Sequence, residues 1–269
     1  MNSENYKRYF PTITQSIILC MLIVGVTIIL SFSLILIVNP SNLKIDILVW
    51  INVPIFAIVL FIGWMWSKKP LHNYFQHKRV PLHFISVSIM TALGIIILIG
   101  DIENLIQYFF PISNNVLDMF EMLLSGGSGV LAAIIMASVT EEVFFRGMIL
   151  PGLARNYGKI AGIFITAFLF GIIHLNPWQF LPAFIMGIYI GWIYLTTRNI
   201  WLCIGIHSFN NAIAAIPQYL GMEIQGLVYD VREGVQFNPF WLNVIGVVLC
   251  VGGIVILKSY TNKNNNIGV

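Results

Sequence analysis

Charged residues are scarce in this sequence, since only 9% of its 269 residues are Asp, Glu, Lys or Arg. A soluble domain usually carries about a quarter. Hydrophobic residues make up 58% of the chain, and the mean hydropathy is +0.86. This composition excludes a soluble enzyme, a disordered chain and a nucleic-acid-binding protein, although the net charge is +3. We therefore interpret residues 1–269 as a single polytopic membrane domain in contact with the lipid bilayer.

Cysteine is also scarce. The three cysteines, Cys20, Cys203 and Cys250, all fall in apolar stretches. Such a set does not predict a disulfide framework.

Long apolar runs, by contrast, are abundant. A helix needs about 20 apolar residues to cross the hydrocarbon core of a bilayer. Suitable runs lie near 13–38, 45–66, 81–100, 129–150, 160–175, 178–197, 200–220 and 240–257. The sequence thus predicts an all-α membrane protein, a bundle of about eight transmembrane helices. Between two of these runs, residues 101–125 repeat apolar side chains at helical spacing, which predicts amphipathic surface helices in an extracytoplasmic segment.

The basic residues give the orientation, because cytoplasmic segments carry an excess of Lys and Arg. With eight spans and a cytoplasmic N-terminus, the outer segments hold only two basic residues, Lys44 and Arg232. The inner segments hold Lys7, Arg8, Lys68, Lys69, Lys78, Arg79, Arg155, Lys159, Arg198, Lys258 and Lys263. Most acidic residues fall outside: Asp46, Asp101, Glu103, Asp118, Glu121, Glu223, Asp230 and Glu233, while Glu4 falls inside. We expect both termini to be cytoplasmic in a multi-pass cell-membrane protein.

This assignment leaves three residues of charged type at membrane depth, Glu141, Glu142 and Arg146. A charge near the bilayer centre costs at least ~2.5–3.5 kcal/mol, so such residues usually face the protein interior and serve a function. Glu142 and Arg146 are four positions apart and share a helix face, which allows an ion pair. Glu141 points about 100° away from Glu142 around the helix axis. Without an equal partner, it has the environment of a general base.

Two further apolar runs carry polar side chains of catalytic type. His174 lies in one, and His207 shares a helix face with Asn211 in another. Taken singly, each could be a group that hydrogen-bonds one helix to another. Their conjunction with the glutamates favours hydrolysis: Glu141, with His174, activates water, and His207 and Asn211 stabilise the oxyanion. In a second variant, Glu141, His174 and His207 hold a zinc ion that lowers the pKa of the water. The sequence leaves both variants open.

Three motifs carry a family resemblance: Glu141-Glu142-x-x-x-Arg146, Phe170-x-x-x-His174 and His207-x-x-x-Asn211. In this order on successive spans, they resemble the CPBP family, the CAAX proteases and bacteriocin-processing enzymes, also called the Abi family. The resemblance covers residues 128–215, the expected catalytic core.

The resemblance implies an intramembrane endopeptidase that cleaves a membrane-associated protein or peptide. It implies that Glu141 activates the water with His174 as its partner, that His207 and Asn211 bind the oxyanion, and that Glu142 and Arg146 support them. The family has been called a metalloprotease family, yet its site also supports a metal-free mechanism. Bacterial members are linked to peptide maturation, bacteriocin self-immunity or membrane-protein processing, and the Ile- and Asn-rich composition suggests a low-GC bacterium.

Other motifs in the sequence suggest other functions. A rhomboid-type serine nucleophile at Ser128, in Gly126-Gly127-Ser128-Gly129, is disfavoured because it lies at the outer start of a helix, where Gly and Ser are ordinary linker residues. Tyr229-Asp230 is half of an aspartyl protease motif without its second aspartate, and H-E-x-x-H is absent. The alternatives from another class are a non-catalytic immunity or scaffold protein and a small proton-coupled transporter that uses Glu141 and His174.

Overall fold

The computed structural model describes residues 8–37 and 50–266, and within these ranges every extended regular element is a helix. The long helices are α1 (Ile13–Ile37), α3 (Asn52–Ser67), α4 (Leu82–Phe109), α9 (Lys159–Ile172), α10 (Pro177–Thr197), α11 (Ile200–Tyr219) and α12 (Phe240–Asn266). A further helix is composite, consisting of α6 (Gly127–Leu131), α7 (Ala137–Glu142) and α8 (Leu150–Tyr157) joined by π-helical segments. The short elements are α5 (Asn114–Leu124) and the 3-10 turns Leu71–Tyr74 and Val231–Glu233. The all-α membrane fold predicted from the sequence is confirmed.

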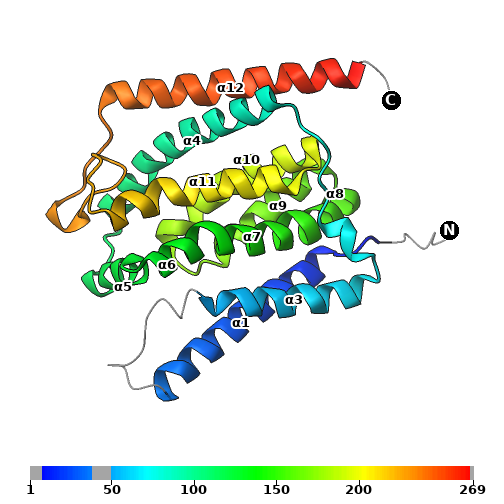
Figure 1. Ribbon diagram of the computed structural model, residues 1–269, viewed down its shortest axis with the longest axis horizontal. Coiled ribbons are helices and arrows are strands. Elements are labelled where there is room, and N and C mark those ends of the chain that lie inside the picture. The colour runs from blue at the N-terminus through cyan, green and yellow to red at the C-terminus, as the bar shows by residue number, and fades with distance from the viewer. Residues whose placement is uncertain (1–7, 38–49, 267–269) are drawn as a thin grey trace.

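The helices run alternately back and forth along one common direction (Figure 1). Within the described residues, six are long and apolar enough to cross a membrane: α1, α4, the composite helix 127–157, α10, α11 and α12. The apolar helices α3 and α9 are shorter, with 16 and 14 residues. The expected count of eight spans is therefore not established, and part of the expected span 45–66 lies outside the described residues.

The composite helix 127–157 lies at the centre of the bundle. Its π-helical segments, Ala132–Met136 and Val143–Ile149, leave only one and a half turns of α-helix, α7, between them. Every residue from Glu142 to Leu150 is buried. Because π-helical segments change the angular register of the side chains that follow, they are frequent at functional sites.

Two hydrophobic cores lie on opposite sides of this central helix. On one side Val143 packs with α4, α10 and α11. On the other side Phe144 and Phe145 pack with α1, α3 and α9. Figure 1 shows the same division, with α1 and α3 below the central helix and α4 and α12 above it. Residues 142–150 of this helix are buried on all sides and can hold polar side chains such as Glu142 and Arg146 away from lipid.

The outer segment 101–125 forms two different structures. Residues 102–109 continue α4 as its last turns, whereas residues 114–124 form the separate amphipathic helix α5, which buries no side chain. The segment 220–239 lies at the same end of the bundle (Figure 1). Two groups of contacts hold it there. Asn104 Nδ2 donates to the Gly226 carbonyl oxygen over 2.8 Å, and Arg232 pairs with Asp118 and Glu121 of α5.

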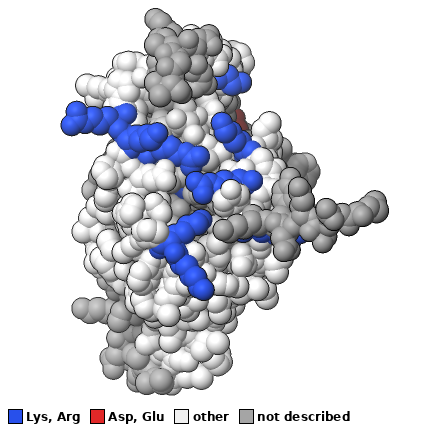
Figure 2. Space-filling view, turned by 90° about the vertical axis from the view of Figure 1, so that its right-hand side faces the viewer, with Lys and Arg blue, Asp and Glu red and all other residues white. Residues whose placement is uncertain are grey.

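Basic side chains gather at the opposite end of the bundle, where α1 begins and α12 ends (Figures 1 and 2). Almost no acidic side chain is visible on that face. The described basic residues at helix ends on this side are Lys68, Lys69, Lys78, Arg79, Arg155, Lys159 and Arg198. Glu4, Lys7, Lys44 and Asp46, which also entered the expected orientation, lie outside the described residues.

Candidate active site

A buried ion pair forms the centre of the candidate site. Arg146 Nη1 donates to Glu142 Oε1 over 2.7 Å, and both side chains are completely buried. The spacing of four residues predicted this pair. Arg146 Nη2 also donates to the Gly187 carbonyl oxygen on α10 (3.2 Å), and its guanidinium group lies 4.9 Å from the centre of the Phe170 ring on α9. The pair thus links the central helix to α9 and α10.

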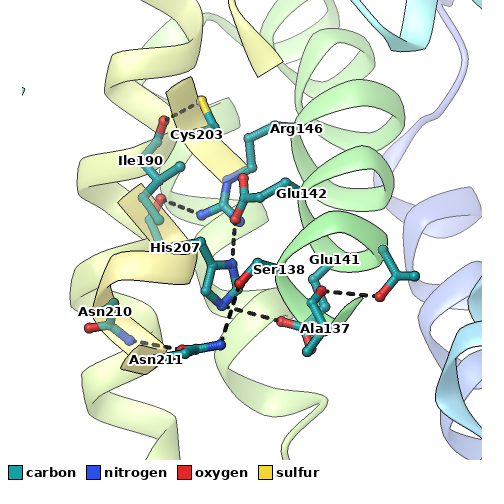
Figure 3. A network of polar contacts seen from close by, with 12 residues as sticks. Ala137, Ser138, Glu141, Glu142, Arg146, Ile190, Cys203, His207, Asn210 and Asn211 are labelled. Atoms are coloured by element: carbon teal, nitrogen blue, oxygen red, sulfur yellow. Dashed lines mark hydrogen bonds and ion pairs between the residues drawn. The ribbon is translucent and has the colours of Figure 1, made fainter. Parts of the chain in front are cut away.

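His207 joins the two glutamates (Figure 3). Its Nδ1 lies 2.8 Å from Glu142 Oε1, and its Nε2 lies 3.8 Å from Glu141 Oε2. An ionised carboxylate only accepts hydrogen bonds, so Nδ1 is the donor to Glu142 and the ring is held with Nε2 toward Glu141. Glu142 therefore both neutralises Arg146 and orients His207, which the sequence spacing alone did not predict.

Asn211 lies one turn beyond His207 on α11 and near Ser138 (Figure 3), and it also contacts the first π-helical segment. Its Nδ2 donates to the Ala133 carbonyl oxygen (2.9 Å) and lies 3.5 Å from Ser138 Oγ. Its Oδ1 accepts from Asn210 Nδ2 (3.1 Å). An amide nitrogen carries two hydrogens. One is committed to Ala133, while the other has only the long Ser138 contact and can turn to a substrate oxygen.

His174 follows α9, which has only 14 residues and ends at Ile172. Its Nδ1 lies 2.9 Å from the Phe170 carbonyl oxygen, so Nε2 is the nitrogen left for other contacts. Phe170 packs edge-on against both histidines, with ring centres 5.3 Å from His174 and 5.6 Å from His207. The motif Phe-x-x-x-His therefore brings His174 beside the same aromatic ring as His207.

The turn after His174 has a specific local cause. Leu175 has a left-handed backbone (φ 55°), which is rare for a residue with a branched side chain and ends the helix. Asn176 then caps α10, because its Oδ1 accepts from the Gln179 backbone N–H over 2.7 Å, and Pro177 occupies the first helical position. This turn fixes where His174 leaves α9.

Two cavities lie beside the candidate site. One, of about 280 Å³, lies between α1, α3 and α7 and is lined by Glu141 and His174. The other, of about 230 Å³, lies between α4, α10 and α11 and is lined by His174, His207 and Asn211. His174 thus lines both cavities, while Glu141 lines the first and His207 lines the second.

The zinc variant, one of the two that the sequence left open, does not fit this arrangement. Zinc requires ligand atoms about 2.0–2.2 Å from a common point. Among the described residues, no three His, Cys, Asp or Glu side chains converge closely enough to hold an ion. As placed here, Glu141, His174 and His207 do not form a zinc site.

The rival motifs have structural surroundings of other kinds. Ser128 lies in the first turn of α6, where the composite helix begins, and the polar contacts of His207 are with the two glutamates. Tyr229 donates to Asn104 Oδ1 (2.8 Å), and Asp230 accepts from the Arg232 backbone N–H (2.9 Å). Both residues belong to the outer segment that is held against α4.

One exposed residue also lines the second cavity, which the sequence did not predict. Glu103 lines this cavity together with Ile96, Ile99 and Gly100 of α4. The spacing of three, four and seven positions placed all four on one helix face. This periodicity was the signal that could have identified Glu103, but it continues past the expected end of the span at residue 100.

Comparison with known proteins gives one match. Residues 126–213 match the family model described as type II CAAX prenyl endopeptidase Rce1-like. The comparisons with curated proteins and with solved structures gave no match. The matched segment contains all three motifs, from Glu141 to Asn211. Residues 126–213 therefore carry the pattern of the Rce1-like CAAX endopeptidases, a membrane protease family, and the resemblance predicted from the sequence is confirmed.

Proposed function

We propose that this protein is an intramembrane endopeptidase that hydrolyses a peptide bond in a membrane-associated protein or peptide, with Glu141 as the residue that activates water. The observation that carries the proposal is the position of His207, which is fixed by Glu142 and faces Glu141 across 3.8 Å. A carboxylate and an oriented imidazole at this distance form a pair that can hold and deprotonate one water molecule.

The distance between the two groups suits a water beside them. A water about 2.8 Å from each atom completes a triangle on the 3.8 Å side between Glu141 Oε2 and His207 Nε2. In this position it gives one proton to Glu141 while its oxygen attacks the carbonyl carbon. Glu141 then passes the proton to the leaving amine, so one carboxylate serves as base and then as acid.

The tetrahedral intermediate needs donors for its oxygen. The Asn211 Nδ2 hydrogen that makes only the long Ser138 contact supplies one, and His207 Nε2 supplies the second when the imidazole is protonated. A protonated His207 also balances charge, since with Arg146 it offsets Glu141 and Glu142. Such neutrality matters because a net charge is costly in a site surrounded by apolar helices.

We place His174 as the partner of Glu141 on the first cavity. Its Nδ1 is held by the Phe170 carbonyl oxygen, which leaves Nε2 to contact the water or the substrate. The scissile bond then lies at the junction of the two cavities, with substrate on both sides of it. The basic face in Figure 2 is the cytoplasmic face on this account, and both termini are cytoplasmic.

The experiment that tests the function compares peptides released from membranes of cells that carry the wild-type protein or Glu141→Gln. We expect specific fragments with the wild type that are absent with Glu141→Gln, although both proteins accumulate equally. The matched control is Glu121→Gln, which removes an exposed carboxylate on α5 and should leave the fragments unchanged. Identical fragments from wild type and Glu141→Gln would contradict the proposal and favour a scaffold protein.

A further inference from the structure

The second cavity holds a carboxylate that the proposed mechanism does not use. Glu103 lies near the end of α4 and shares its cavity-facing side with Ile96, Ile99 and Gly100. Its side chain is exposed and also lines the cavity. The same cavity is lined by His207 and Asn211, so Glu103 faces the space that contains the proposed oxyanion donors.

The neighbours of Glu103 on α4 have structural partners. Asp101 accepts from the Asn238 backbone N–H over 2.7 Å and from the Asn243 side chain. Asn104 donates to the Gly226 carbonyl oxygen and accepts from Tyr229. These contacts hold the outer segment 220–239 against α4. In the described part of the chain, by contrast, no hydrogen bond or ion pair reaches the Glu103 carboxylate.

The position of Glu103 relative to the site follows from the helix directions. Both α4 and α11 begin at the basic end of the bundle and run toward the opposite end (Figure 1). We call this the acidic end, because it holds Asp118, Glu121 and Asp230. Asn210, Asn211 and Gln179 line the cavity as uncharged amides. Glu103 lies late in α4, whereas His207 lies in the first half of α11. The carboxylate is therefore on the acidic-end side of the proposed reaction point.

From this placement we infer that Glu103 forms a substrate subsite for a cationic group, the side chain of a Lys or Arg close to the scissile bond. A carboxylate in a partly apolar cavity without a counter-charge gains most from a cation that enters with the substrate. The lining amides can position such a group but do not neutralise it. The inference rests on the proposed function, because it assigns the substrate class of that same site.

The test uses full-length protein in nanodiscs and synthetic membrane-anchored peptides in which one position near the cleavable segment is Lys, Gln or Glu. Glu103→Gln is compared with wild type and with Glu233→Gln, which removes an exposed carboxylate at the same end but outside both cavities. We expect wild type and Glu233→Gln to cleave Lys peptides with a kcat/KM about tenfold or more above that for Gln peptides. Glu103→Gln should lose this preference and keep its rate on Gln peptides.

A binding measurement separates the subsite from catalysis. Peptide affinity is measured by fluorescence anisotropy for Glu141→Gln and for the double variant Glu103→Gln/Glu141→Gln. The subsite is supported if Lys peptides bind more tightly than Gln peptides to Glu141→Gln but not to the double variant. This holds even if the wild type cleaves none of the peptides. Equal binding of Lys and Gln peptides by both variants overturns it. If only peptides with a free amino terminus gain affinity, the ammonium group that Glu103 binds is the terminal one, and the side-chain assignment is overturned.

Discussion

His207 is held by Glu142, although the two residues are 65 positions apart in the chain: Nδ1 lies 2.8 Å from Oε1. The same oxygen accepts from Arg146 over 2.7 Å. One carboxylate oxygen thus connects the charge of Arg146 to the orientation of the proposed catalytic histidine. On the proposed mechanism, this relationship divides the motif Glu-Glu-x-x-x-Arg into a reacting residue, Glu141, and a positioning residue, Glu142.

Glu142→Gln is expected to lose both stability and activity. The amide removes the negative charge and leaves Arg146 buried without a counter-charge, which costs about 3–5 kcal/mol. The thermal midpoint of the purified protein should therefore fall markedly, and cleavage with it. The double variant Glu142→Gln/Arg146→Met should recover much of the midpoint without recovering cleavage. If the double variant cleaves like wild type, Glu142 does not position His207.

The two neighbouring asparagines of α11 provide a matched pair. Asn211→Ala removes the proposed oxyanion donor and should lower kcat about 100- to 1,000-fold with a small change in KM. Asn210→Ala removes only the hydrogen bond to Asn211 Oδ1 and should lower kcat far less. Steady-state kinetics on one peptide substrate measures both. Equal losses in the two variants would argue against an oxyanion role for Asn211.

The sequence predicted the parts of the site that depend on spacing within one helix. Four-residue spacing gave the Glu142–Arg146 pair and the common face of His207 and Asn211, because helix geometry fixes which side chains are neighbours. Because charged residues are scarce in the rest of the spans, these few indicated a functional site.

The rest of the site depends on contacts between helices, which spacing does not encode. The bond from His207 to Glu142 joins α11 to the central helix, and the bond from Asn211 to Ala133 ends in a π-helical segment. A π-helical segment alters the register by an amount that hydrophobic periodicity does not reveal. Charge counting placed Glu103 at the surface, and the residue is exposed, but counting did not predict that α4 continues to Phe109 and brings Glu103 to the second cavity as well.

The turn that carries His174 gives a second matched pair. Asn176 caps α10, and Asn199 caps α11 by accepting from the Leu202 backbone N–H over 2.9 Å. Loss of such a cap costs about 1 kcal/mol, so Asn176→Ala and Asn199→Ala should lower the thermal midpoint to a similar degree. Only Asn176→Ala should also lower kcat, because it loosens the turn next to His174. Full activity of Asn176→Ala would show that the turn does not position His174.

The orientation in the membrane is tested by cysteine labelling of intact cells. Arg79 lies at the basic end and Glu233 at the acidic end, and both are exposed. A membrane-impermeant maleimide should label Glu233→Cys in intact cells and Arg79→Cys only after lysis. The unsubstituted chain, whose cysteines are buried or partly buried, is the control. The reverse pattern would contradict cytoplasmic termini.

The most direct test of the account is the rate of peptide cleavage by purified, reconstituted protein with and without the Glu141 carboxylate. Wild type and Glu141→Gln are compared on the same membrane-anchored peptide, at equal amounts of folded protein judged by thermal midpoint. If Glu141 activates the attacking water, the rate with Glu141→Gln falls by at least about 100-fold while the midpoint changes little. A Glu141→Gln protein that cleaves at the wild-type rate would contradict the account.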